Sequence, residues 1–249
     1  MPHKTRREEL KSFGAAVASI PVVSTVSSAE TVRLREYREL MWNGKVKEAE
    51  KLLQKSGVDY TITRGRLSDV STDRYGAPGN DDVTDCFFSL TKLEDATANE
   101  PAVYDATFSV VLSEWDSFAD RGKVVDPNDG VGIGFDTVYW QAVDPSADGV
   151  SYTDDRFSFD GWNGGLKMQY DDPGTPTDGT DQQFSTGVST KLEAISRDVF
   201  DGEYNVKGTY VHTWSDNGGY DMSFSFSNLT LQPSTSGPGT WTMGAGGKA

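Results

Sequence analysis

Histidine and cysteine, the side chains that most often bind transition metals or act as bases and nucleophiles, are nearly absent from this sequence. The 249 residues include two histidines, His3 and His212, and one cysteine, Cys86. With His3 in an N-terminal segment that we expect to be removed, this count excludes histidine-rich zinc sites and two-histidine copper sites. A Ser-His-Asp triad would have to use His212, which lies in a strand-like segment, and the chain has no G-x-S-x-G elbow. We therefore expect His212 to be structural, and Cys86 to be a buried apolar residue because a single thiol cannot form an internal disulfide.

Paired carboxylates are the next chemistry to consider, because a glycosidase needs two of them. Glu114-Trp115-Asp116 is similar to the start of the E-x-D-x-x-E run of laminarinase-like glycosidases, which are built on a jelly roll. Ser117–Asp120 follow, so the second glutamate is missing. In that family the two glutamates act as nucleophile and acid, and the resemblance therefore implies only half of the machinery. A glycan-active hydrolase that uses two carboxylates remains an alternative, with no residue assigned to catalysis.

Oxygen ligands for a hard cation occur in two loop-like segments. Asp126, Asn128 and Asp129 are close in sequence in the first, and the second runs from Asp171 to Asp178. Calcium takes about six to eight oxygen ligands, and neither segment has the spacing of an EF-hand loop. Such segments arise readily by chance in an acidic chain. We therefore expect no cofactor, with structural calcium at Asp126, Asn128 and Asp129 as the alternative.

Tryptophans beside Asp, Asn or Gly give the most positive indication of ligand binding. Trp115, Trp162 and Trp214 are the candidates. An exposed indole next to carboxylates suits a sugar, because the ring face packs on the apolar side of the sugar while the oxygens accept hydrogen bonds from its hydroxyls. The alternative for each tryptophan is a place in the core. Asn228-Leu229-Thr230 is a glycosylation sequon, which makes Asn228 a candidate for modification in an exported protein.

Hydrophobic periodicity divides the chain into a short helical part and a long β part. Apolar residues recur at helical spacing over residues 30–57, with a break at Asn43-Gly44 and a cap at Gly57, which predicts two short helices packed as a hairpin. Over residues 58–249 the period changes to two, and turn residues separate about ten short segments. No helix long enough for a parallel crossover lies between them. The sequence therefore predicts an antiparallel β-sandwich or jelly roll. The predicted strands are Tyr60–Arg66, Thr84–Leu93, Tyr104–Leu112, Val131–Phe135, Val138–Val143, Arg156–Phe159, Leu166–Tyr170, Phe184–Ile195, Glu203–Trp214, Tyr220–Phe226 and Leu229–Gln232.

Two details of the β part carry further expectations. Gly130-Val-Gly-Ile-Gly-Phe135 superficially resembles a phosphate-binding glycine pattern, but a strand-like segment follows it instead of a helix. A dinucleotide site needs a helix N-terminus aimed at the pyrophosphate, so we interpret these glycines as strand positions that permit close packing or a bend. A slip in the alternation between Phe226 and Leu229 predicts a bulge or a bend there.

The first 29 residues have the parts of an export signal in the expected order. Arg6 and Arg7 lie in a cationic start, a weakly apolar run covers residues 13–23, and Ala29-Glu30 offers a cleavage point after small side chains. The segment resembles twin-arginine signals, which implies recognition by the twin-arginine translocase, export of a folded protein and cleavage by a signal peptidase. The apolar run has about half of the roughly 20 residues that span a bilayer, so we expect no permanent membrane span. The alternative is an ordinary amphipathic N-terminal helix.

The net negative charge of the chain indicates the salt concentration of the solvent in which the protein works. The chain has 38 acidic and 23 basic residues, a net charge of −15, and the charge without residues 1–29 is −17. Such an acidic surface repels itself in dilute buffer, whereas molar salt shortens the Debye length to about 3 Å and screens the repulsion. The composition resembles that of halophilic proteins, and with the signal it resembles haloarchaeal twin-arginine-exported proteins of unknown function. The alternative is a moderately acidic mesophilic secreted protein. The same charge argues against nucleic acid and anionic membranes as partners.

Three classes of function fit these observations. The first is an exported halophilic binding module, secreted or at the cell surface, whose ligand the sequence does not identify and for which a glycan is the candidate. The second is the glycan-active hydrolase, and the third is a structural component of the cell envelope that uses the helical hairpin as an assembly contact. The lack of convergent catalytic side chains in the sequence favours the binding module.

Overall fold

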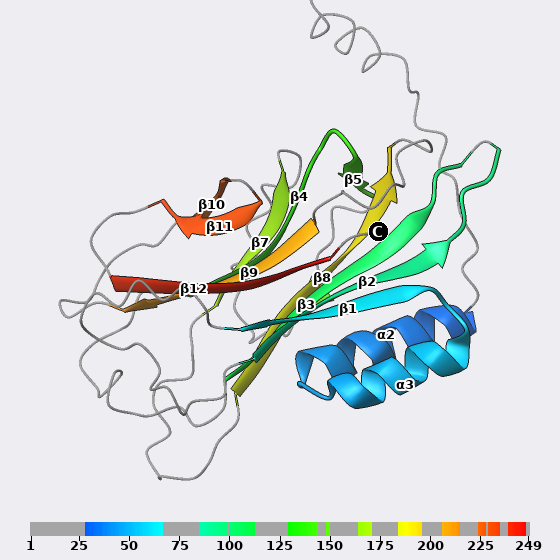
Figure 1. The fold of residues 1–249 in the computed structure, drawn as a ribbon, viewed down its shortest axis with the longest axis horizontal. Helices are drawn as coiled ribbons and strands as arrows, with labels where there is room; N and C mark the ends of the chain where they lie inside the picture. The colour runs from blue at the N-terminus through cyan, green and yellow to red at the C-terminus, as the bar shows by residue number, and fades with distance from the viewer. Residues whose placement is uncertain are drawn as a thin grey trace, which may run out of the picture. The chain divides into compact units, whose positions relative to one another are not determined.

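A computed structural model of the chain describes residues 28–66, 85–98, 100–112, 129–143, 148–149, 164–170, 184–195, 206–214, 224–227, 229–234 and 239–247. The chain divides into two compact units, Met1–Leu34 and Arg35–Ala249. The described residues are mostly in strands, and every strand pair is antiparallel, which confirms the predicted mostly-β fold with two short helices near the N-terminus (Figure 1).

The helices lie where the periodicity predicts them. α2 spans Ser28–Trp42 and α3 spans Val46–Ser56. Gly57 ends α3 in the left-handed region, with φ 68°, and its N–H donates to the carbonyls of Leu53 and Gln54. The turn before β1 thus takes the αL cap that a glycine favours. The predicted cleavage point, Ala29-Glu30, lies in the first turn of α2.

The strands form two larger sheets and one hairpin. Sheet A has the order β1-β2-β3-β8-β5, with β6 also paired to β8, and sheet B has the order β12-β9-β4-β7. The strands of sheet A are β1 (Tyr60–Arg66), β2 (Asp85–Glu94), β3 (Val103–Leu112), β5 (Trp140–Ala142), β6 (Asp148–Gly149) and β8 (Phe184–Ala194). The strands of sheet B are β4 (Asp129–Phe135), β7 (Gly165–Tyr170), β9 (Val206–Trp214) and β12 (Gly239–Gly247). β10 (Phe224–Ser227) and β11 (Thr230–Pro233) pair with each other.

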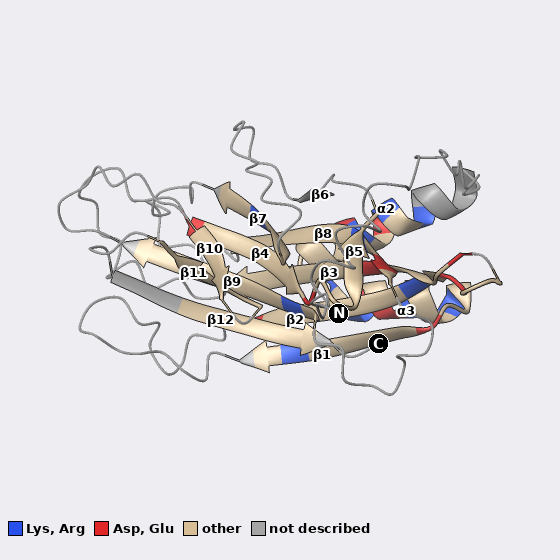
Figure 2. Ribbon diagram, turned by 90° about the horizontal axis from the view of Figure 1, so that it is seen from above, with Lys and Arg blue, Asp and Glu red and all other residues tan. Residues whose placement is uncertain are grey.

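The main core fills the space between sheets A and B. Alternate residues of each strand point into it, among them Phe88 and Phe108 from sheet A and Ile133 and Tyr210 from sheet B. Gly208 of β9 lies so close to Phe108 that an added Cβ would come within 2.1 Å of the ring. The missing side chain therefore lets the two sheets approach each other at this point. Charged residues of both signs are dense along α2 and α3 and more sparsely spaced along the strands (Figure 2).

The β10–β11 hairpin packs on the outer face of sheet B, and the glycines of β4 make room for it. A Cβ on Gly130 or Gly132 would meet the ring of Phe224 or Phe226 within 3 Å, and one on Gly134 would meet the backbone of Leu229 at 2.4 Å. The interpretation of this glycine pattern as one that permits close packing is therefore confirmed. The predicted bend after Phe226 is also present, as a tight turn in which Leu229 has φ 64°.

The sequence did not predict β12, which pairs along its whole length with β9. Four of its nine residues are glycines, a residue type with low strand propensity, and pairing in the fold overrides that propensity. β6, placed in a predicted connector, was missed as well. Arg156–Phe159, a predicted strand, lies outside the described residues.

Cys86 is fully buried on β2, as expected for an apolar residue. Burial raises the pKa of its thiol to about 12, so the reactive thiolate is scarce in the folded protein. We expect Ellman's reagent to leave Cys86 unlabelled at pH 8 and to label it fully once guanidinium chloride has unfolded the chain. Rapid labelling without denaturant would contradict the buried position.

Candidate functional site

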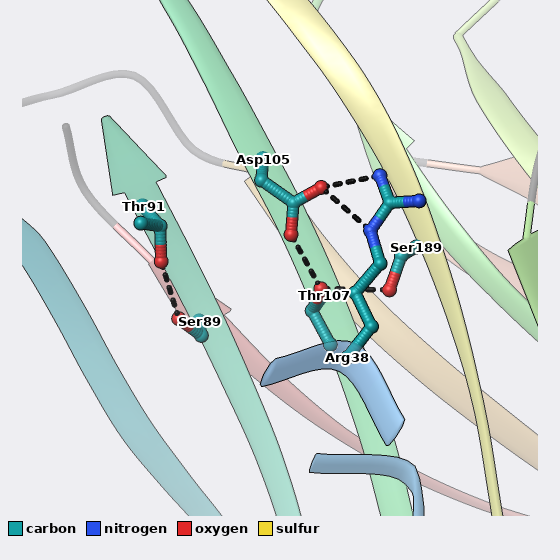
Figure 3. A network of polar contacts seen from close by, with 6 residues as sticks. All are labelled: Arg38, Ser89, Thr91, Asp105, Thr107 and Ser189. Atoms are coloured by element: carbon teal, nitrogen blue, oxygen red, sulfur yellow. Dashed lines mark hydrogen bonds and ion pairs between the residues drawn. The ribbon is translucent and has the colours of Figure 1, made fainter. Parts of the chain in front are cut away.

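The first polar cluster lies between α2 and the outer face of sheet A (Figure 3). Arg38 of α2 donates from Nε and from one terminal nitrogen to Oδ1 of Asp105 on β3, at 3.0 and 2.5 Å. The two side chains are 9% and 0% exposed. A buried carboxylate is tolerated here because a buried cation and hydrogen bonds compensate it.

Hydroxyl groups extend this cluster across three strands. Thr107 donates to Oδ2 of Asp105 at 2.8 Å, and its hydroxyl lies 2.7 Å from that of Ser189 on β8. On β2 the hydroxyls of Ser89 and Thr91 lie 3.3 Å apart. All of these side chains are buried, although their strand positions alternate with those of the apolar core. The outer face of sheet A is therefore polar and covered.

Two aromatic residues of α2 complete the contact. The indole of Trp42 fills the place of a side chain at Gly187, where an added Cβ would come within 2.3 Å of it. Tyr37 is fully buried, and burial followed by the charge of Asp105 raises the pKa of its hydroxyl well above the usual value. Among the described atoms, Trp42 Nε1, the Tyr37 hydroxyl and the hydroxyl of Ser109 have no hydrogen-bond partner within bonding geometry.

A second buried polar cluster lies at the start of β4. Asp129 is 2% exposed and accepts a hydrogen bond from the Tyr210 hydroxyl at 2.6 Å and one from the backbone N–H of Thr213 at 2.8 Å. Nδ1 of His212 lies 3.0 Å from the same carboxylate. The carboxylate thus holds the imidazole and the tyrosine in fixed orientations, and the buried strand position agrees with a structural role for His212.

This second cluster lies at the end of the sandwich where five connections between strands begin and end, including the two longest, 67–84 and 113–128. Pairs at this end are Arg66 with Asp85, Asp129 with Tyr170, and Trp214 with Gly239, and Figure 1 shows these strand ends toward the same side of the view. The segments that join strands here are 67–84, 113–128, 171–183, 215–223 and 235–238. By sequence they hold 14 acidic and three basic residues, a net charge of −11, which is most of the chain's total of −15.

The structure relates some of the predicted site residues to this end. Trp214 is the last residue of β9, next to the Asp129 cluster. Trp115 lies in segment 113–128, and Trp162 lies before Gly164, whose carbonyl accepts from Phe135 at the opposite end of β4. Seven predicted site residues lie outside the described residues: Arg6, Arg7, Trp115, Asp126, Asn128, Trp162 and Asn228.

The structure describes one of the three calcium candidates. Asp126 and Asn128 lie outside the described residues, whereas hydrogen bonds within the protein engage both carboxylate oxygens of Asp129. In the part of the chain that the structure describes, no group of three or more His, Cys, Asp or Glu side chains is arranged to hold a metal ion. Over the same residues, no helix has both the length and the apolar character to cross a membrane.

Comparison with protein-family models and with curated proteins finds no match to this chain. Among solved structures, the chain has a likeness to one described as "pH-induced modulation of Streptococcus parasanguinis adhesion by Fap1 fimbriae", with 10% identity and a TM-score of 0.32. The likeness covers 77% of this chain and 96% of that one. A similarity this distant carries no argument about the function of this chain.

Sequence reasoning missed both members of the ion pair. Arg38 lies between apolar positions of a helix with charged residues on every side, and Asp105 occupies a position that alternation assigns to solvent. Nothing in either local pattern distinguishes them from surface residues. The Asp129 cluster gave a partial signal, because His212 and Asp129 were both singled out by residue type but for separate reasons.

Proposed function

We propose that this chain is an exported β-sandwich binding module, secreted or held at the cell surface, whose ligand is a glycan bound at the Asp129 end of the sandwich. The observation that carries the proposal is the convergence of five connections at that end. Three of them exceed 12 residues (67–84, 113–128 and 171–183), a length that is uncommon in compact domains and that is found in binding loops and active-site lids as well as in linkers. Long segments on a rigid sheet scaffold are a common way to build a binding surface.

The chemistry of this end suits a polyhydroxylated ligand. The five segments supply many carboxylates, which accept hydrogen bonds from sugar hydroxyls, and Trp115 and Trp214 belong to this end by sequence and topology. The buried bonds among Asp129, Tyr210 and Thr213 would give the segments fixed starting points, which lowers the cost of ordering them around a ligand.

A glycan array probed with the mature protein in molar salt tests this function. We expect binding that Trp115→Ala and Trp214→Ala weaken by at least tenfold, because an indole that stacks on a sugar supplies much of the contact. Trp162→Ala is the matched control, since β7 begins at the other end of the sandwich, and its binding should equal that of wild type. An empty array together with an empty pull-down from envelope extracts would refute the binding function.

Export by the twin-arginine pathway and adaptation to high salt belong to the same proposal. Mass spectrometry of the native protein should find a terminus near Glu30, and Arg6→Lys/Arg7→Lys should leave the precursor inside the cell. Dialysis from molar to millimolar salt should abolish the near-ultraviolet circular dichroism, because the acidic surface loses its screening. An intact Met1 on a cytosolic species would overturn export, and an unchanged spectrum would overturn the adaptation to salt.

A further inference from the structure

The contact between the α2–α3 hairpin and sheet A is built like an interface between proteins. Its anchors on the helix are Tyr37, Arg38 and Trp42, the residue types that dominate binding energy at interfaces between chains. Trp42 enters a notch made by Gly187, and Arg38 forms an ion pair whose two side chains are 9% and 0% exposed. The core cluster between the two sheets also contains tyrosine and tryptophan, but its members are all aliphatic, aromatic or sulfur-containing side chains, whereas the hairpin contact includes a charged pair.

The two sides of this contact would behave differently if they separated. The outer face of sheet A carries Asp105 and the hydroxyls of residues 89, 91, 107, 109 and 189, all of which water can solvate. The hairpin would instead expose Met41, Ala49 and Leu53, which are buried in this structure. A released hairpin therefore needs a partner surface, whereas the part of the sheet face around Asp105, where hydroxyl groups predominate, remains compatible with water.

The connection between the hairpin and the sheet is short enough to act as a hinge. α3 ends at Ser56 and β1 begins at Tyr60. The carbonyl of Asp59 accepts a hydrogen bond from the backbone N–H of Lys92, at 2.8 Å, so Asp59 is already held against β2. The hinge that would reorient the hairpin therefore consists of Gly57 and Val58. An element that is joined through a short terminal hinge is one that identical chains can exchange, because only the hinge residues have to change conformation.

We propose that this contact also joins two copies of the chain, each hairpin docking on sheet A of the other copy. The chemistry selects the occupant, because any helix that covers Asp105 without supplying a cation would bury an unpaired carboxylate. The hairpin of a second copy supplies Arg38 in the correct place, together with Tyr37 and Trp42. The exchanged dimer goes beyond the proposed binding function, since it holds two sandwiches together and so presents two binding ends at once.

Charge reversal split between two chains tests the exchange. Arg38→Asp places two aspartates at the contact within one chain, and Asp105→Arg places two arginines there. In an exchanged pair of the two variants, both contacts regain one aspartate and one arginine. We expect each variant alone to be monomeric by light scattering, and the two unfolded and refolded together to form a heterodimer that exceeds either homodimer by at least tenfold.

Two controls make a negative result decisive. Arg64→Asp and Asp85→Arg reverse an ion pair between neighbouring strands of one chain, 47% and 17% exposed, and their mixture should remain monomeric. Arg38→Asp/Asp105→Arg in one chain should restore docking of its own hairpin, seen as slow amide exchange over residues 35–57. A monomeric Arg38/Asp105 mixture alongside a docked double variant would overturn the proposal.

A second measurement does not depend on the variants. Two wild-type chains with different affinity tags are refolded together at high protein concentration, and each tag should then recover the other chain in a dimer that persists on dilution. If neither tag recovers the other chain, the exchange is wrong, whatever the glycan array shows.

Discussion

Arg38→Met is expected to release the α2–α3 hairpin from sheet A and to lower the free energy of unfolding by about 3–5 kcal/mol. The substitution removes the cation from a carboxylate that is 0% exposed and, among the residues that the structure describes, leaves the Thr107 hydroxyl as a side-chain donor to Asp105. Methionine keeps most of the side-chain volume, so the loss reflects charge more than packing. Urea unfolding gives the free energy, and hydrogen exchange over residues 35–57 shows whether the hairpin opens before the sheets.

Three further variants separate charge from other causes. Arg38→Met/Asp105→Asn should recover part of the loss, because no buried charge is then left uncompensated. Arg38→Met/Lys191→Met removes a lysine that lies opposite Asp105 in the β3–β8 register and could replace the lost cation. Arg35→Met is the surface control, since Arg35 pairs with Glu39 in the open, at 82% and 52% exposed, and its effect should stay below about 1 kcal/mol. Equal losses for Arg35→Met and Arg38→Met would contradict the buried pair.

The alternation of residue types predicted the sheets well because it reports on a local property. In β3, Tyr104, Ala106 and Phe108 alternate with polar residues, and any strand with one face on a core shows that pattern. What covers the other face is a matter of tertiary packing. Asp105 therefore looked like a residue in solvent, whereas a helix 67 positions earlier in the chain buries it.

The same reasoning explains the strand that was missed and the glycines that were understood. β12 has little strand propensity of its own, and its place is set by nine paired positions along β9, a long-range feature that no local window contains. The glycines of β4 were interpretable because the absence of a following helix excludes a phosphate site. Which aromatic rings fill the space above them depends on the β10–β11 hairpin, which lies about 90 residues further along the chain and could not be inferred from that pattern.

For the candidate site as well, the sequence predicted the residue types but not how the fold brings them together. Residue type alone brought attention to His212, Trp214 and Asp129, but the sequence placed the first two on a strand and the third in a loop-like segment, with calcium binding there as an alternative. The structure brings all three to one end of sheet B, because Gly130 pairs with Val211. Asp129 then faces Tyr210 and His212 across a strand pair, and it accepts a hydrogen bond from the Tyr210 hydroxyl.

Asp129→Ala is expected to cost roughly 3–6 kcal/mol, because the Tyr210 hydroxyl, His212 Nδ1 and the Thr213 N–H all lose the carboxylate that they face. Each buried donor that loses its acceptor costs about 1–3 kcal/mol, whereas a typical hydrogen bond contributes only about 1 kcal/mol net. Tyr210→Phe, which deletes a donor instead of the shared acceptor, should therefore cost far less. Thermal and urea unfolding of the three proteins give the values.

Calcium distinguishes the hydrogen-bonded role of Asp129 from the ligand role that the sequence left open. If Asp129 only accepts hydrogen bonds, the melting temperature of wild type should be the same with calcium and with a chelator at constant ionic strength, and Asp129→Ala should be destabilised equally in both. Asp136→Ala is the matched control, because that carboxylate accepts from the backbone N–H of Val138 at a more exposed turn, and its cost should stay near 1 kcal/mol. A calcium-dependent rise in melting temperature that Asp129→Ala abolishes would instead make Asp129 a ligand, and its present hydrogen bonds would then describe the calcium-free arrangement of the same residue.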